Sequence, residues 1–175
     1  MHNPQISAFS TRITRDPSWS SSQLAAAQEI LDALDAHGAC PSVVQGEEWA
    51  AAQGQARNDY DLLAEVPLWR HSLRVAELIA PLAPSLYRPD LIIVALAHDL
   101  GKAPALRGQF YAGRQHATMI DLAIDTLCPS IKRLRNYRRV RAAIADHHRS
   151  HYSEPWTGIL KKADHSARRS ELAEI

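Results

Sequence analysis

Apolar residues recur every three or four positions along most of this chain, which is the spacing of amphipathic α-helices. The clearest stripe consists of Leu68, Val75, Ile79 and Leu82, and it predicts a helix from Pro67 to about Leu82. Similar stripes, most of them opened by Pro or Ser, predict further helices over residues 23–37, 89–101, 114–127, 129–147 and from 157 through 164.

One segment, residues 91–97, is continuously apolar and fits either a buried strand or a buried helix by pattern alone. The Pro89-Asp90 start and the Gly101 end favour a helix. No convincing alternating strand pattern accompanies it. We therefore expect an all-α architecture, a bundle of about six to eight helices.

The N-terminal part is patterned more weakly than the rest. Residues 1–20 contain Pro4 and Pro17 and show little periodicity, so we interpret them as an arm that either packs on the domain or is loose. Residues 21–175 are expected to form a single helical domain, which is long enough for a real core. Within it, residues 39–58 carry at most one helix, over 46–53.

The composition narrows the class of protein. Of the 175 residues, 46% are apolar and 22% are charged, which is typical of a globular chain. The apolar run 91–97 is too short to cross a bilayer, so no membrane is expected. The start of the chain lacks the pattern of a signal peptide, and Cys40 and Cys128 lie far apart. These features exclude a disulfide scaffold and a Cys-based zinc knuckle, and they favour a cytoplasmic location.

The net charge of +1 conceals an asymmetry along the chain. Residues 1–66 carry 3 basic and 9 acidic side chains, whereas residues 67–175 carry 17 basic and 10 acidic ones. The second part suits an anionic partner, such as a phosphate ester or a nucleic acid. The alternative is that both sets of charges are solvated surface.

Basic residues are concentrated over residues 132–141, and they too either bind an anionic partner or form solvated surface. Lys132, Arg135 and Arg139 share one helical face, which could follow a nucleic-acid backbone. Only Tyr137 would offer a ring for base stacking, which favours a solvated face instead.

The candidate chemistry lies in the histidines, of which the chain has 9. Several of them, together with two carboxylates, fall at inward-facing or terminal positions of different predicted helices: His71, His98, Asp99, His116, His147, His148 and Asp164. Each alone has an ordinary explanation as a core or helix-capping residue. Burying all of them would cost several kcal/mol unless something pairs them, and a bound cation does so. Mixed imidazole and carboxylate donors suit Fe, Mn, Zn, Co or Ni, with Mg as a further candidate.

These residues resemble a known signature. His71, the string Ala-His-Asp-Leu-Gly-Lys at 97–102, and Asp164 within Lys-Ala-Asp are similar to the H…HD…D pattern of the HD-domain metal-dependent phosphohydrolase superfamily. The resemblance covers residues 67–168. It implies an all-helical HD-domain bundle in which His71, His98, Asp99 and Asp164 ligate one metal ion.

His116 and His147 or His148 resemble the additional histidines of HD subfamilies that hold two metal ions, which implies a dinuclear site bridged by Asp99. The Gly-Tyr-Pro signature of cyclic-di-GMP-degrading members is absent after His148, which argues against that substrate. The histidine pair, a Trp-containing turn and the Lys-Lys-Ala-Asp string also resemble HD modules of conjugative relaxases. The number of metal ions, one or two, stays open.

The chemistry that this set suggests is hydrolysis of a phosphate ester, with a nucleotide as the expected substrate. A metal ion lowers the pKa of a bound water, Asp99 orients it, and Lys102 neutralises charge on the phosphoryl group. Lys102 has an alternative role as a cation that balances a helix C-terminus. Arg114 and Arg149 are candidate phosphate clamps, because arginine can bind phosphate through two donors.

Two other functions compete with the enzyme. The chain could bind a nucleotide without turning it over, or it could be a nucleic-acid-associated module of a mobile element or regulatory system. The sequence predicts a phosphorylated small molecule as partner, with nucleic acid as the alternative, and it leaves the oligomeric state and the choice between monoester and diester open.

Overall fold

The computed structural model describes residues 1–43, 59–106 and 116–175. Within these ranges the chain forms eight α-helices and no strand, which confirms the all-α prediction. The α-helices are α1 (Pro4–Thr14), α2 (Ser21–His37), α4 (Asp59–Leu63), α5 (Leu68–Ile79), α6 (Arg88–Ala97), α8 (His116–Leu127), α9 (Tyr137–Asp146) and α10 (Pro155–Glu174). Short 3₁₀ turns are η1 (Ser85–Tyr87), η2 (Leu100–Lys102) and η3 (Pro129–Arg133).

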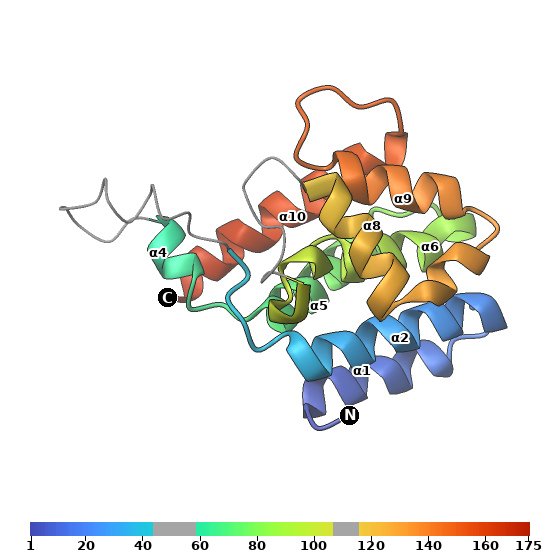
Figure 1. Ribbon diagram of the computed structural model, residues 1–175, viewed down its shortest axis with the longest axis horizontal. Coiled ribbons are helices and arrows are strands. Elements are labelled where there is room, and N and C mark those ends of the chain that lie inside the picture. The colour runs from blue at the N-terminus through green and yellow to red at the C-terminus, as the bar shows by residue number, and fades with distance from the viewer. Residues whose placement is uncertain (44–58, 107–115) are drawn as a thin grey trace.

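Helix α6 is surrounded by other helices, and Figure 1 shows it behind α8, between α9 and α2. It packs against α5, α2, α9 and α10, and every residue from Pro89 to Ala97 is buried. The continuous apolar run therefore belongs to a helix surrounded on all sides, as its Pro-Asp start predicted. No helix in the described ranges has the length and apolar character needed to cross a membrane.

Buried polar side chains fix the neighbours of α6. Asp90, in its first turn, accepts hydrogen bonds from Gln23 Nε2 (2.8 Å) on α2 and from Asn136 Nδ2 (2.6 Å) before α9. Glu29 on α2 accepts two more from the backbone and hydroxyl of Ser130 in η3. Buried polar groups without partners are costly, so these bonds favour the observed placement of α2, η3 and the start of α9 around α6.

Helix α1 lies in the N-terminal segment and packs on α2 and α5. Asn3 caps α1 by accepting hydrogen bonds from Gln5 and Ile6, and Pro4 follows it at the first helical position. Ile6, Phe9 and Ile13 provide a short buried stripe. The carboxylate of Asp35 on α2 accepts hydrogen bonds from the backbone of His2 and Asn3, which joins the two helices at this end.

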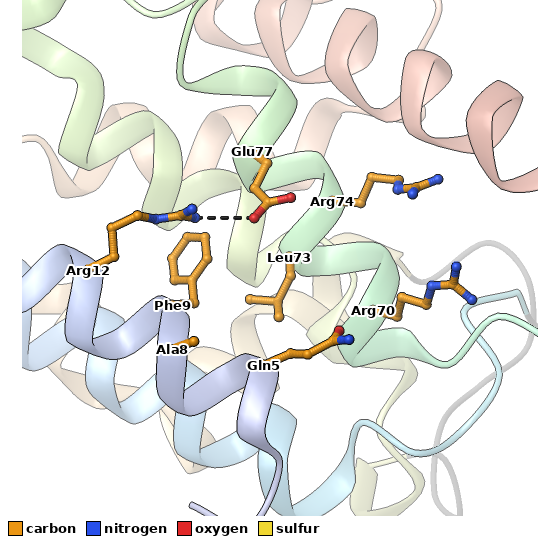
Figure 2. Close-up of a pocket in the computed structure, with 8 residues that line it drawn as sticks. All are labelled: Gln5, Ala8, Phe9, Arg12, Arg70, Leu73, Arg74 and Glu77. Carbon is orange, nitrogen blue, oxygen red and sulfur yellow. Dashed lines mark hydrogen bonds and ion pairs between the residues drawn. The ribbon is translucent and has the colours of Figure 1, made fainter.

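A groove between α1 and α5, with a volume of about 440 Å³, is shown in Figure 2. Arg12 reaches across it to Glu77 (3.3 Å), with Phe9 and Leu73 between the two helices. Its other lining residues are Gln5, Ala8, Arg70 and Arg74. Arg70 and Arg74 point toward α10 and pair with Glu174, so the charges at this groove largely serve to hold α5 between α1 and α10.

Four predicted helix boundaries differ from the structure. The helix expected to reach about Leu82 ends at Ile79. The helix expected over 129–147 is broken: η3 ends at Arg133, the backbone of the following Leu134 is extended (φ −67°, ψ 138°), and α9 begins at Tyr137. The helix expected to reach Gly101 ends at Ala97, before the turn η2. Helix α10 continues beyond Asp164 to Glu174. The helix proposed for residues 46–53 lies outside the described residues.

Candidate metal centre

Four imidazoles from three different helix regions form a row inside the bundle. The ring centroids of His71 and His98 lie 5.2 Å apart, those of His98 and His147 also 5.2 Å, and those of His147 and His148 3.9 Å. His71 and His98 have no exposed surface, His147 is buried, and His148 is exposed at the outer end. The row therefore runs from the core of the bundle to its surface.

Two carboxylates face this row. The Oδ2 atom of Asp99 lies 3.4 Å from His98 Nε2 and 3.9 Å from His71 Nε2, and its Oδ1 atom lies 3.8 Å from His147 Nε2. The Oδ1 atom of Asp164 lies 3.1 Å from His71 Nε2. Two ligand atoms about 2.1 Å from one ion are about 3.0 Å apart at a right angle and about 3.4 Å apart at the tetrahedral angle. The separations of 3.1 and 3.4 Å match these values, whereas those of 3.8 and 3.9 Å would require wider angles at a shared ion.

The backbone turn after α6 brings His98 and Asp99 into position together. His98 continues the helical geometry, and Asp99 (φ −112°, ψ 9°) leaves it, so the two side chains point to the same side. Gly101 then lets η2 pack on α8, since a Cβ atom there would lie 2.9 Å from the Cβ of Met119. A larger residue in this turn would push it away from α8.

The second ring nitrogen of each buried histidine is held by a hydrogen-bond partner. His71 Nδ1 lies 2.9 Å from Glu171 Oε1, His98 Nδ1 lies 2.7 Å from the carbonyl of Ala95, and His147 Nδ1 lies 2.6 Å from the carbonyl of Ile144. An acceptor at Nδ1 favours the tautomer that carries its proton there. The lone pair of Nε2 is then available to a metal ion.

The atoms turned toward the centre are buried and make no hydrogen bond within the described residues: His71 Nε2, His98 Nε2, Asp99 Oδ1 and Asp164 Oδ1. Leaving such groups buried without a partner costs about 1–3 kcal/mol each. Two groups of side chains bring ligand atoms within 4.8 Å of one another, namely His71, His98 and Asp99, and then Asp99, His147 and His148. The donor set fits one or two divalent transition-metal ions, with Asp99 common to both groups.

Two cations contact the Oδ2 atom of Asp99, the same oxygen that faces His71 and His98. Lys102 Nζ donates to Asp99 Oδ2 (2.6 Å) and to the carbonyl of Ser42 (2.8 Å). Arg168 lies 3.5 Å from the same Asp99 oxygen, and it donates to the hydroxyl (2.7 Å) and carbonyl (3.1 Å) of Ser42. The structure thus places Lys102 at the site, bonded to Asp99.

These neighbours shift the acid–base equilibria of the cluster. Burial opposes ionisation of Asp99, but the charges of Lys102 and His98 hold its pKa well below the ordinary value. Burial likewise opposes ionisation of Asp164, and the contact with His71 and the charge of His98 lower its pKa. Burial disfavours the charged form of His98, while Asp99 outweighs it and raises the pKa. For His148, desolvation dominates and lowers the pKa. Both aspartates are therefore ionised near neutral pH, which is the form that binds metal.

Of the other predicted site residues, Arg149 lies at the surface, and the side chains of His116 and Arg114 are outside the described residues. Arg149 is exposed and pairs with Asp146 (3.1 Å), while its backbone carbonyl accepts a hydrogen bond from Lys161. His116 begins α8, but its side chain is outside the described residues. Arg114 also lies outside them.

Sequence reasoning missed Ser42, Arg168 and Glu171. The available signal was the spacing of Asp164, Arg168 and Glu171, which places all three on one face of α10 beside the buried Ala163 and Ala167. Charged residues at such spacing are usually solvated, so this signal was weak on its own.

The basic run of residues 132–141 is partly used by the fold. Lys132 pairs with Asp125, Arg141 pairs with Asp121, and Arg139 pairs with Glu154. Arg139 also lies over the ring of Trp156, 4.2 Å from its centroid. Arg133, Arg135 and Arg138 are exposed.

A model of the HD domain family matches residues 68–171, which is more than half of the chain. The matched segment begins at α5 and ends at Glu171, so it includes the whole cluster described above. No curated protein and no solved structure matches the chain significantly.

Proposed function

Because this chain belongs to the HD domain family, we propose that it is a metal-dependent phosphohydrolase that cleaves a phosphate ester, with a nucleotide as the expected substrate. The observation that carries the proposal is the convergence of His71, His98, Asp99 and Asp164 with ligand atoms 3.1–3.9 Å apart and with buried polar atoms left unbonded. A divalent ion held there would supply Lewis-acid activation of water and of a phosphoryl oxygen.

The protein's own residues would position and balance the reacting groups. Asp99 stays ionised beside Lys102, so it can accept a hydrogen bond from a water molecule and orient it. Lys102 and Arg168 bring two positive charges to the same wall of the site, where they can stabilise charge that develops on a phosphoryl group. The exposed edge of His148 marks the side from which a substrate would approach.

The test is phosphate release by protein that has been stripped with a chelator and reloaded with Mn, Fe, Co, Ni, Zn or Mg separately. The substrates are nucleoside monophosphates, together with one synthetic monoester and one diester. His98→Ala and Asp99→Ala should abolish both metal retention and turnover, whereas His151→Ala, an exposed histidine, should change neither. Nucleotide-dependent thermal stabilisation without phosphate release by any loaded form would instead support a binding module.

A second readout of the same protein is the metal stoichiometry. About two ions per chain would support ligation by both groups that share Asp99. About one ion would support the inner group of His71, His98, Asp99 and Asp164 alone. The metal stoichiometry does not depend on the exposed arginines at 133, 135 and 138. Nucleic-acid binding by these arginines is therefore tested separately, through the salt dependence of binding.

A further inference from the structure

His71 is contacted on both of its ring nitrogens by carboxylates of the same helix. Asp164 on α10 faces Nε2 (3.1 Å), and Glu171 on α10 faces Nδ1 with both oxygens (2.9 and 3.2 Å). Glu171 is only 1% exposed and His71 is not exposed at all. A fully buried carboxylate is rare unless it has a specific partner, and here that partner is a candidate metal ligand.

Helix geometry explains how one helix reaches both sides of the ring. Asp164 and Glu171 are seven positions apart, which places them on the same face two turns apart. Ala163 and Ala167, both fully buried, allow α10 to approach closely enough for this double contact. The imidazole of His71 is therefore fixed in its plane by α10.

Glu171 is itself held in place by Arg168. The Nη1 atom of Arg168 lies 3.3 Å from Glu171 Oε2, and the same atom donates to the hydroxyl of Ser42 (2.7 Å). The guanidinium thus fixes the carboxylate and balances its charge, while Ser42 anchors the guanidinium. Ser42 is tied in turn to Val66 through its backbone N–H (2.9 Å).

We propose that Glu171 is a positioning residue for the metal centre, and this inference rests on the proposed function. Its carboxylate accepts the Nδ1 proton of His71, keeps the Nε2 lone pair directed toward Asp99 and Asp164, and makes the imidazole a stronger donor. Outer partners of this kind typically change metal affinity about 10–100-fold when they are replaced.

A purely structural role for Glu171 makes a different prediction. In that case its replacement would lower the stability of the fold but would leave the metal affinity of the folded protein unchanged. The decisive variant is Glu171→Gln, which keeps the shape and one acceptor oxygen but removes the negative charge. The matched control is Glu174→Gln on the same helix, whose carboxylate pairs with Arg70 and Arg74 and does not contact His71.

The measurement is the dissociation constant for Co²⁺ and Zn²⁺ in competition with a chromophoric chelator, together with the visible absorption of the Co²⁺ form. Both are taken at a temperature at which circular dichroism shows each variant folded. Glu171→Gln should weaken binding about 10–100-fold and shift the Co²⁺ absorption, whereas Glu174→Gln should bind within about twofold of the unchanged chain. If Glu171→Gln yields too little folded protein, Glu171→Asp, which retracts the carboxylate by one methylene, replaces it with the same expectation.

Equal affinity and equal Co²⁺ spectra for the unchanged chain and the Glu171 variant would overturn this inference and leave the proposed function standing. Failure of the unchanged chain to bind any of these ions would overturn the proposed function and this inference with it. Metal binding by the unchanged chain therefore shows which of the two proposals has failed.

Discussion

Replacing Lys102 by Met tests whether its ammonium group is there to balance Asp99. The Nζ atom lies 2.6 Å from Asp99 Oδ2, and the two side chains are only 9% and 2% exposed. Met is close to Lys in length and removes the charge without opening a large cavity. The carbonyl of Ser42 keeps a donor, because Arg168 also bonds to it.

The magnitude follows from the burial and the distance. At an effective dielectric constant of 20, unit charges 2.6 Å apart attract by about 6 kcal/mol before any desolvation is counted. Removing one partner of a buried pair is found to cost about 3–5 kcal/mol when the other charge is left uncompensated. This range is an upper bound here, because Arg168 stays 3.5 Å from the same Asp99 oxygen. For a chain of 175 residues this corresponds to a fall in melting temperature of about 6–20 °C.

The assay is thermal unfolding of the metal-free and the metal-loaded protein, for Lys102→Met and for the control Lys132→Met. Lys132 also pairs with an aspartate, Asp125, but the side chains are 47% and 55% exposed, so its removal should cost less than about 1 kcal/mol. A divalent ion at Asp99 supplies positive charge of its own, so the loss caused by Lys102→Met should be clearly smaller in the loaded protein.

Two results would refute this reasoning. One is an equal fall in melting temperature for the two lysine variants, which would mean that burial does not decide the cost. The other is a Lys102→Met loss that metal does not reduce although metal binds. In that case the ammonium would act on the fold through Ser42 alone.

The remaining predictions concern the turn after α6 and the buried thiol. Gly101→Ala should destabilise the fold by about 1–3 kcal/mol, because its Cβ would lie 2.9 Å from that of Met119, and urea denaturation measures this loss. Unchanged stability of the Gly101→Ala variant would refute the close packing of η2 on α8. Burial raises the pKa of Cys128 to about 12 from 9.0. Below about pH 9, the fraction of Cys128 present as thiolate is then about a thousandfold lower than for an unshifted thiol. Native Cys128 should therefore resist iodoacetamide up to pH 9 and react once urea unfolds the chain. Mass spectrometry after alkylation reads out both cysteines, and rapid native labelling of Cys128 would contradict the raised pKa.

Much of the bundle could be predicted because its helices begin or end at residues typical of helix termini and carry apolar residues at helical spacing. Pro89 and Asp90 identified α6 as a helix despite its all-apolar run, and the stripe of α5 placed His71 inward. Helix α1 was missed because only Ile6, Phe9 and Ile13 are buried in it, a pattern too short to stand out between prolines. The break at Leu134 was missed because the local sequence does not show that η3 packs on α2.

The candidate site divides in the same way. Residues whose types are diagnostic, namely His71, His98, Asp99 and Asp164, could be selected from the sequence alone, and they do converge. Arg168 and Glu171 could not, because a charged residue on a helix face is ordinary until the partner helix is placed against it. Glu171 has its partner, His71, on α5, 100 residues earlier in the chain. Arg168 has its partners at Ser42 and Asp99, which are also distant in sequence.

The small side chains of Ala163 and Ala167 have a consequence for how this protein tolerates mutation. They are invisible to any search for reactive groups, yet they set the distance at which α10 lies from its neighbours. A change to Val or Leu at either position would move the helix outward and carry Asp164 and Glu171 away from His71 together. A variant with a larger residue at 163 or 167 would therefore lose the geometry of the metal centre although every ligand residue is still present. The presence of the full set of ligand residues in a sequence does not by itself guarantee that the site forms.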